Sequence, residues 1–416
     1  MTAIRIPRAR CGPSAAPRPC VTHLHSSRIL GGAKIVAERI CVSITDYEHY
    51  ECRFVEISPN NQMFESFWAS FRFRIEKRIL GWGFSETATP SRYVPLIDAK
   101  STDLVHLHSP YDSGMTISEI RRLGGSFPLV WTIHDARWVE ARGRGSNDGI
   151  EIPFRAGLGF WFKQVGSIVL RARVRRAMGV AFVVFPSAWL RNSAITYGLV
   201  QPNRSAVISS PVSESFFNLP TTKSAAREKH GLPYDKPIVL FAAWKAWKTK
   251  GDMNKGYDLL EKAIVELRKH HDFVFAVLGN DGQGIPSTLE AYWIPPDGTE
   301  LQVAEIMRAA DCIIGASRHE ALGATIQESL AVGTPAIVSG ASGYLEVVED
   351  RVDGLHFEPE SHTDLAGKIS EFLKSADMRD AMSTNATRRA REQWHPSVSA
   401  EKYAQVYSQA LSKGRP

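Results

Sequence analysis

Two glutamates near residue 320 have a spacing that could hold both ends of one ligand. Glu320 ends a loop, and Glu328 lies inside a helix that the pattern predicts from about Ala324 to Val332. Eight residues at roughly 100° each place the two carboxylates about 80° apart around the helix axis and at most about 12 Å along it. Carboxylates accept hydrogen bonds, so this pair could hold a ligand that carries hydroxyl groups at two ends.

The start of the same helix offers an anion site between the two carboxylates. Free N–H groups and the positive end of the helix dipole meet at a helix N-terminus, and both favour phosphate. These N–H groups belong to Leu322, Gly323 and Ala324. A nucleotide sugar, with hydroxyls at its ends and phosphates in the middle, fits this layout. In the alternative interpretation, Glu320 only caps the helix and Glu328 is a solvated surface residue.

The residues after this helix continue the pattern in a recognisable order: Glu320, Glu328, Gly333-Thr334-Pro335, the apolar strand Ala336 to Val338, Gly343 and Glu346. The whole run resembles the signature of the retaining glycosyltransferases of family 4, also called group 1. The resemblance implies an α/β protein with the GT-B fold, two Rossmann-like domains facing across a cleft. It also implies transfer of a hexose from a UDP- or GDP-sugar to a polysaccharide or lipid-linked oligosaccharide. Glu320 would then hold the transferred sugar, and Glu328 the ribose.

A lysine-rich loop could neutralise a leaving diphosphate, because lysine acts on phosphate as a mobile point charge. The family pairs an arginine and a lysine here, with the lysine before a glycine at a helix start, and Lys255-Gly256 matches that lysine. The arginine has no clear counterpart, and Lys245, Lys248 or Lys250 could replace it. No Asp-x-Asp motif flanked by strands is present, so we expect a metal-independent reaction without a cofactor.

Histidines follow two predicted strands, and ligands of doubly wound folds lie at the carboxyl ends of strands. His106 and His108 end one strand, and His134-Asp135 follows the next. A Trp-Thr-apolar-His-Asp run resembles a branch of the family in which this histidine lies near the anomeric centre. The resemblance implies that His134 acts with Glu320 in catalysis, with Asp135 as its orienter or an acceptor contact. His106 and His108 could instead be structural histidines; His108 stays a possible site residue.

Adjacent glycines follow the first predicted strand. Gly31 and Gly32 open a helix, and glycine lets the backbone approach a ligand closely. The family has a Gly-Gly-Ala at this place, facing the donor phosphate and the acceptor. The alternative is an ordinary turn.

Apolar strands alternate with helical patterns, which predicts two parallel sheets. We expect a disordered leader at 1–18, a first Rossmann-like domain at 19–212, a linker at 213–236, a second, nucleotide-sugar-binding domain at 237–394, and a helix at 395–416 that returns to the first domain. The predicted strands of the first half are Cys20–Leu24, Cys52–Ile57, Leu104–Leu107, Leu129–Ile133, Ala181–Phe185 and Ala206–Ser209. Those of the second half are Ile238–Ala242, Phe273–Leu278, Cys312–Ile314 and Ala336–Val338.

The five cysteines are scattered without a Cys-x-x-Cys spacing. This argues against a zinc site or a disulfide framework and is typical of a reducing cytosol. No apolar run approaches the roughly 18 residues of a transmembrane helix. We therefore expect a cytoplasmic protein.

The charge is uneven: residues 1–200 carry 26 Lys and Arg against 16 Asp and Glu, and the remainder 24 against 28. A basic first half could contact an anionic membrane. The predicted helix Met63–Leu80 carries aromatic and basic residues, and so do Phe160-Trp161-Phe162 and the arginines after them. These features favour peripheral contact with the inner face of the membrane; the alternative is an ordinary core helix with a solvated face. No nucleic-acid motif accompanies the charge, so we expect no nucleic-acid partner.

Two other functions remain open from the sequence. One is a GT-B enzyme of another reaction class, a nucleotide-sugar epimerase or a phosphorylase. The other is a non-catalytic nucleotide-sugar-binding protein, which the altered lysine loop and the residues Ala136 to Val139 after His134-Asp135 would favour.

Overall fold

A computed structural model of the chain describes residues 18–26, 32–47, 50–57, 71, 75, 97–108, 110, 115–136, 139, 158–242, 253–279, 286–295 and 298–412. The chain forms two compact units. The first comprises Met1–Pro211 with Pro396–Pro416, and the second comprises Val212–His395. Residues 1–17 of the expected leader lie outside the described residues.

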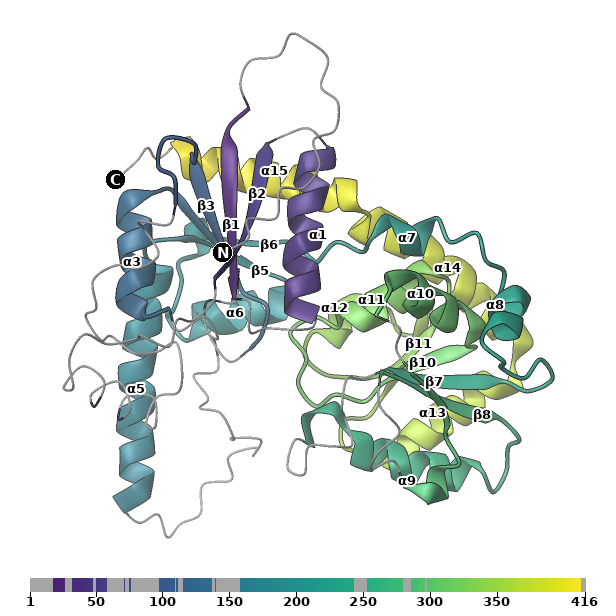
Figure 1. The fold of residues 1–416 in the computed structure, drawn as a ribbon. Helices are drawn as coiled ribbons and strands as arrows, with labels where there is room; N and C mark the ends of the chain where they lie inside the picture. Colours follow the sequence, from purple (N-terminus) through teal and green to yellow (C-terminus); the bar gives the residue numbers. More distant parts are fainter. Residues whose placement is uncertain are drawn as a thin grey trace, which may run out of the picture. The chain divides into compact units, whose positions relative to one another are not determined.

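The first unit is built on six parallel strands in the order β2-β1-β3-β4-β5-β6 (Figure 1). Their bounds are β1 Cys20–Ser26, β2 Glu51–Ile57, β3 Leu104–His108, β4 Leu129–Thr132, β5 Phe182–Phe185 and β6 Ser205–Val207. Every strand predicted for this half is present. The strand order reverses between β1 and β3, which makes the carboxyl ends of these strands the switch point where doubly wound sheets bind ligands.

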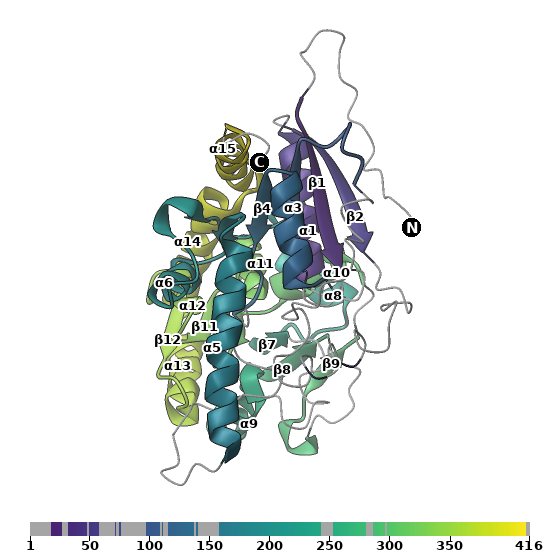
Figure 2. The ribbon, with the colours of Figure 1, turned by 90° about the vertical axis from the view of Figure 1, so that its left-hand side faces the viewer.

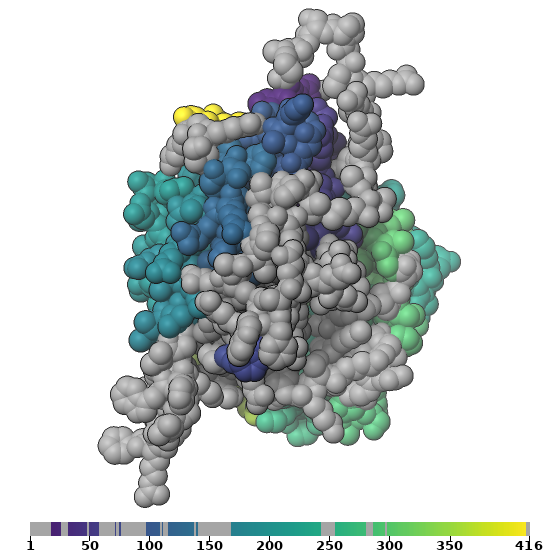
Figure 3. Space-filling view, turned by 60° about the vertical axis from the view of Figure 1, so that its left-hand side comes forward, coloured from purple at the N-terminus to yellow at the C-terminus, as the bar shows by residue number. Residues whose placement is uncertain are grey.

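Helices cover this first sheet. They are α1 Gly32–Asp46, α3 Ile117–Ser126, α5 Leu158–Met178, α6 Ala188–Thr196 and α15 Pro396–Ser412. Thr116 begins α3 with a capping box: its hydroxyl accepts a hydrogen bond from the Glu119 N–H at 3.3 Å, and the Glu119 carboxylate accepts one from the Thr116 N–H at 2.9 Å. In Figures 2 and 3, α3 and α5 lie side by side.

The C-terminal helix α15 completes the core of the first unit. It packs against α1, β3 and β4 (Figure 1, yellow). Tyr403 and Tyr407 project from it and are fully buried. The Tyr403 hydroxyl lies 3.1 Å from Thr132 Oγ1, and the Tyr407 hydroxyl lies 2.6 Å from His106 Nδ1. Polar groups in the interior of this unit therefore depend on partners from the end of the chain.

The second unit has six parallel strands in the order β12-β11-β10-β7-β8-β9. They are β7 Ile238–Ala242, β8 Val274–Leu278, β9 Tyr292–Ile294, β10 Cys312–Gly315, β11 Ala336–Ser339 and β12 Gly354–Phe357. Alternate residues of β7 enter two separate apolar cores: Ile238 and Leu240 face one, and Val239 and Phe241 face the other. The strands β9 and β12 were not predicted from the sequence, because edge strands of three and four residues are too short for a recognisable periodicity.

The helices of the second unit are α7 Glu214–Phe217, α8 Lys223–Lys229, α9 Tyr257–Leu267, α10 Glu300–Ala309, α11 Ala324–Ala331, α12 Tyr344–Val347, α13 His362–Lys374 and α14 Ala376–Trp394. The stretch 213–236, expected as a linker, contains α7 and α8, which pack against α10 within this unit.

None of the helices that the structure describes is long and apolar enough to cross a membrane. Of the predicted helix Met63–Leu80, only Phe71 and Ile75 are described, and both are exposed. The side chains of Phe160-Trp161-Phe162, at the start of α5, lie outside the described residues. Peripheral membrane contact therefore stays a prediction.

We expect Tyr407→Phe to lower the thermal unfolding midpoint of the full-length chain. It removes the partner of a fully buried imidazole nitrogen of His106, and an unsatisfied buried polar group costs about 1–3 kcal/mol. Tyr234→Phe, at an exposed position, is the matched control. Equal midpoints for the two variants would show that the Tyr407 hydroxyl does not stabilise the docked helix.

Candidate functional site

Two predicted site residues form an ion pair in the second unit. Lys255 follows β7 in a 3-10 turn, Met253–Lys255, and Glu320 follows β10. Lys255 Nζ donates a hydrogen bond to Glu320 Oε2 at 2.8 Å. The order of the sheet reverses between β7 and β10, so the pair lies at the switch point of this unit. The Lys255 side chain is 45% exposed and that of Glu320 21%, which leaves the pair open to a ligand.

Asn254 holds the two loops of the ion pair together. Its side chain donates to the His319 carbonyl at 3.0 Å and accepts from the His319 N–H at 3.1 Å. Its own carbonyl accepts from the Arg318 N–H at 2.7 Å. Three hydrogen bonds on the residues next to Lys255 and Glu320 fix the positions from which these two side chains reach each other.

Arg318 adds a second link between the same elements. Its guanidinium donates two hydrogen bonds of 2.9 Å to Asp258 on α9, and it also pairs with Glu360. Burial alone would raise the pKa of Asp258, but the hydrogen bonds and the charge of Arg318 outweigh it and lower that pKa. Bidentate pairs of this kind fix geometry as well as charge. Neither Asn254 nor Arg318 was identified from the sequence.

A glycine permits the close approach of these loops. Gly256 has a φ of 65°, and a Cβ there would meet the carbonyl oxygen of Ala316 and lie 2.8 Å from its carbonyl carbon. A side chain at this position would push apart the segments that carry Lys255 and Glu320. The lysine-glycine order read from the sequence thus has a physical reason.

The loop that precedes α11 is hydrogen-bonded to the loop that contains Ser342 and Gly343. The Glu320 N–H donates to Ser342 Oγ at 3.0 Å, and the Gly343 N–H donates to the Glu320 carbonyl at 3.0 Å. A Cβ on Gly343 would lie 2.7 Å from the Ala321 backbone. The buried ring of Tyr344 lies against Gly323, and burial raises the pKa of this phenol to about 12. Tyr344 was not identified from the sequence either.

A glycine stands at the N-terminus of α11. Gly323 is its N-cap with a φ of 105° and makes no side-chain cap hydrogen bond. Leu322 and Gly323 are buried, whereas Ala324 is half-buried. Glu328 lies in the second turn of the helix and is also half-buried. The segment therefore has one carboxylate before the helix and a second one within it, as the sequence pattern predicted; their contacts with a ligand stay predictions.

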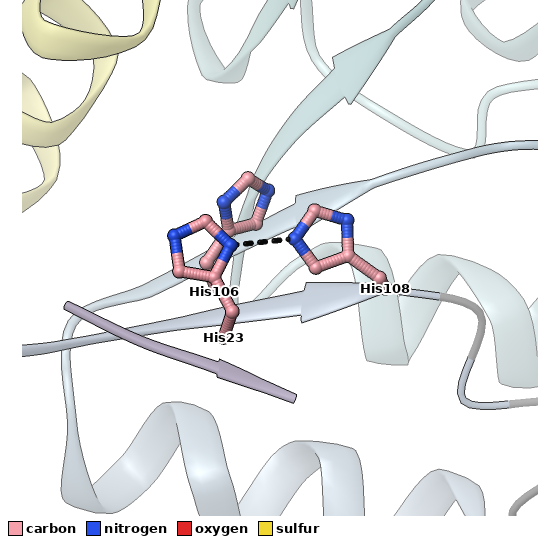
Figure 4. Close-up of side chains that lie close together, drawn as sticks. All are labelled: His23, His106 and His108. Atoms are coloured by element: carbon pink, nitrogen blue, oxygen red, sulfur yellow. Dashed lines mark hydrogen bonds between the residues drawn. The ribbon is translucent and has the colours of Figure 1, made fainter. Parts of the chain in front are cut away.

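In the first unit, three imidazoles form one hydrogen-bonded chain. His23 Nδ1 and His108 Nε2 are 3.0 Å apart, and His108 Nδ1 and His134 Nε2 are 3.0 Å apart. Figure 4 shows the bond between His23 and His108 with His106 beside them. His106 has other partners: its Nδ1 bonds the Tyr407 hydroxyl, and its Nε2 bonds Thr132 Oγ1 at 2.7 Å. His23 was missed because it lies inside β1 rather than at the end of a strand.

Burial keeps His106, His108 and His134 neutral. Burial lowers the pKa of His106 and His108 well below the usual value. Burial and the neighbouring His25 lower the pKa of His134 to about 3. A neutral imidazole has one donor and one acceptor, so each bond in the chain restricts the tautomer of the next ring. His134, half-buried after β4, is the member nearest to the surface.

The remaining predicted residues fall in different places. Gly31 and Lys250 lie outside the described residues, as do Lys245 and Lys248. Gly32 is exposed at the start of α1, and no atom of the described residues lies within 4 Å of where a Cβ would be. Asp135 is half-buried next to His134. Ligand contacts at these positions stay predictions.

Two family models match the chain. The model described as "Glycosyltransferase Family 4" matches residues 30–216, and the one described as "Glycosyl transferases group 1" matches residues 222–389. Among curated relatives, the D-inositol 3-phosphate glycosyltransferase of Thermobispora bispora is 29% identical over 226 residues, which are 51% of this chain and 52% of that protein. The match thus spans about half the length of such relatives.

Solved structures match over nearly the whole chain. Sucrose-phosphate synthase from Thermosynechococcus elongatus matches with a TM-score of 0.67 and 15% identity, covering 95% of this chain and 100% of that one. Anabaena Alr3699/HepE in complex with UDP-glucose matches with a TM-score of 0.60 and 15% identity, covering 94% and 99%. This likeness, together with the two parallel six-stranded sheets, confirms the predicted GT-B fold class.

We expect Gly323→Ala to destabilise the chain more than Gly298→Ala. Both positions have a positive φ, which costs a non-glycine residue about 1–2 kcal/mol. Only at Gly323 does the added Cβ also meet a neighbour, the Tyr344 ring at 2.7 Å. Thermal unfolding of the two variants tests this difference. If their midpoints fall equally, the contact between Gly323 and Tyr344 does not constrain the start of α11.

We expect the stability contributed by His134 to be lost in acid. Its pKa is lowered from 6.5 to about 3, so below pH 6.5 the unfolded chain takes up a proton that the folded chain does not. The contribution of His134 to the free energy of unfolding is thus fully present above pH 6.5. It falls as the pH decreases, by up to about 1.4 kcal/mol per pH unit. Denaturant unfolding between about pH 7 and 5 should show a shallower pH dependence for His134→Asn.

The control for this experiment is His270→Asn, at a side chain that is 69% exposed, and it should keep the wild-type slope. Parallel pH profiles for wild type and His134→Asn would contradict the lowered pKa of His134.

Proposed function

Because the chain belongs to the group 1 glycosyltransferases of family 4, we propose that it transfers a hexose from a nucleotide-diphosphate sugar to a hydroxyl group of a glycan or lipid-linked acceptor. The configuration of the anomeric carbon would be retained, as in the family. The donor would bind to the second unit, around the switch point between β7 and β10.

The observation that carries this proposal is the ion pair of Lys255 and Glu320 beside the uncapped start of α11. An ion pair this exposed contributes only about 1 kcal/mol or less, so a ligand can exchange with it readily. A diphosphate would form an ion pair with Lys255 in place of Glu320. The carboxylate of Glu320 would then accept hydrogen bonds from the sugar hydroxyls. The pair keeps both charges compensated until the donor arrives, so neither has to be desolvated alone.

The other donor contacts follow from the same segment. The N–H groups at the start of α11 would meet a phosphate, and Glu328 in the second turn would hold the ribose hydroxyls. UDP-glucose is bound in the Anabaena structure of the same fold, which supports a nucleotide-diphosphate sugar as the donor class. With Lys255 and the helix N-terminus to compensate the diphosphate, we propose that transfer needs no metal ion.

We propose that His134 serves the transfer step from the first unit. Because its pKa lies near 3, it is a neutral imidazole at physiological pH. It can donate a hydrogen bond to a sugar hydroxyl or help to stabilise charge that develops in the transition state. Its Nε2 is bonded to His108, which restricts the orientation of the ring.

Two observations support a class of acceptor. Several relatives, such as that of Thermobispora bispora, are D-inositol 3-phosphate glycosyltransferases, whose name contains a phosphorylated polyol, and the first half of this chain is basic. Both favour an acceptor that carries a negative charge, such as a lipid-linked glycan at the inner face of the membrane.

The test is nucleotide release from UDP- and GDP-sugars, without acceptor and with EDTA present. We expect one donor to be hydrolysed slowly by the wild type. Lys255→Ala and Glu320→Ala should lower that rate about 100-fold, the usual cost of removing one charge-stabilising contact. Lys255→Arg should retain more activity, and Lys262→Ala, at an exposed position on the neighbouring α9, should have no effect.

Equal release by wild type and Lys255→Ala would refute the role of the ion pair. A requirement for added Mg²⁺ or Mn²⁺ would refute metal independence. If no donor is hydrolysed, calorimetric titration with the same donors decides the matter: weaker binding by Lys255→Ala supports the site, and no binding by the wild type overturns it.

A further inference from the structure

Two thiols and one imidazole meet in the interior of the first unit. Cys41 lies on α1, Cys52 on β2 and His23 on β1, and all three are at least nine-tenths buried. Their ligand atoms, two sulfurs and one ring nitrogen, all lie within 4.8 Å of one another. The proposed transfer chemistry gives neither thiol a role. Buried polar side chains normally have hydrogen-bond partners, so a cluster of three needs an explanation.

The neighbouring imidazoles are less suited to a metal ion, although His23, His106 and His108 are equally close together (Figure 4). Both nitrogens of His106 are bonded to hydroxyl groups, and both nitrogens of His108 are bonded to other imidazoles. An ion bound there would have to break these bonds. His23 is different, because only its Nδ1 is used.

His23 Nε2 is buried and has no hydrogen-bond partner among the described residues, and one ring nitrogen of His23 lies within 4.8 Å of both thiols. Meanwhile Nδ1 is held by His108 at 3.0 Å. A second-shell bond to one nitrogen, with the other nitrogen directed at the ion, is the usual arrangement of a metal-binding histidine.

We infer that His23 Nε2, Cys41 Sγ and Cys52 Sγ bind a thiophilic metal ion, with Zn²⁺ as the best match. Thiolate and imidazole ligands select Zn²⁺ or Cu⁺ over Mg²⁺ and Ca²⁺. Binding of Zn²⁺ releases the two thiol protons, and the two thiolates then cancel the charge of the ion, which lowers the cost of burying it. Three ligands leave a fourth position on Zn²⁺ and also suit Cu⁺.

The geometry needs only small movements to bind an ion. Bonds of about 2.3 Å to sulfur and about 2.0 Å to nitrogen place tetrahedral ligands roughly 3.5–4 Å apart. The present separations of at most 4.8 Å exceed this by about 1 Å, which small side-chain rotations can remove. The scattered cysteines predicted no zinc site from the sequence, because the ligands come from three separate elements rather than from one short motif.

The first experiment measures the metal content of the untagged full-length chain by mass spectrometry. We expect about one equivalent of zinc or copper, as one set of ligands allows, and a loss of at least about tenfold in the Cys41→Ser/Cys52→Ser variant. Cys312→Ser, which removes a buried thiol of the second unit, is the matched control and should keep its metal.

A second measurement does not depend on how well the double variant folds. Wild-type protein is stripped with a chelator under reducing conditions and titrated with Co²⁺. A thiolate-to-cobalt charge-transfer band that saturates at about one equivalent, together with a higher unfolding midpoint in Zn²⁺ or Cu⁺, supports the site. Absence of both metal and band overturns the inference, as does a Cys41–Cys52 disulfide in the purified protein. Neither readout involves sugar transfer, so failure here leaves the proposed function untouched.

Discussion

The second unit depends on one close approach of backbones, that of Gly256 to Ala316. These residues follow the two central strands β7 and β10, and only a residue without a Cβ lets their loops meet. Once they meet, Asn254 can bond to His319, and Lys255 can reach Glu320. The contact between Lys255 and Glu320 thus depends on the absence of a side chain at Gly256, the residue next to Lys255. The ion pair of Arg318 and Asp258 also holds these two segments together.

The first unit is organised around polar rather than apolar contacts in its interior. Imidazoles from β1 and β3 are stacked and bonded to each other, and a hydroxyl of α15 satisfies His106. Buried polar networks specify a single arrangement when their members are hydrogen-bonded to one another. One end of this network is the half-buried His134, and the other is the thiol pair of α1 and β2. The polar network therefore connects the packed interior of the unit to His134, the residue for which we propose a role in the transfer step.

Much of this could be predicted from local patterns. The ten predicted strands and the helix at α11 come from short stretches whose period or residue order is distinctive, and the same kind of pattern marked Lys255 and Glu320 as candidate site residues. Their direct contact could not be predicted, because the two residues lie 65 positions apart and meet only through the fold. His23, Asn254, Arg318 and Tyr344 were missed for the same reason: each acts through partners distant in sequence. The edge strands β9 and β12 were missed because they are too short for a periodic signal.

The place of α15 has a consequence for how the protein is made. Tyr403 and Tyr407 supply hydroxyls to a unit whose strands all lie before residue 212, and the whole of Val212–His395 is translated in between. At the usual 5–20 residues per second, the ribosome takes roughly ten seconds or more to reach the helix. During that time His106 and Thr132 lack their tyrosine partners, and a chaperone or the ribosome itself can contact the surface that α15 later covers. The unit that begins the chain is the last to be completed.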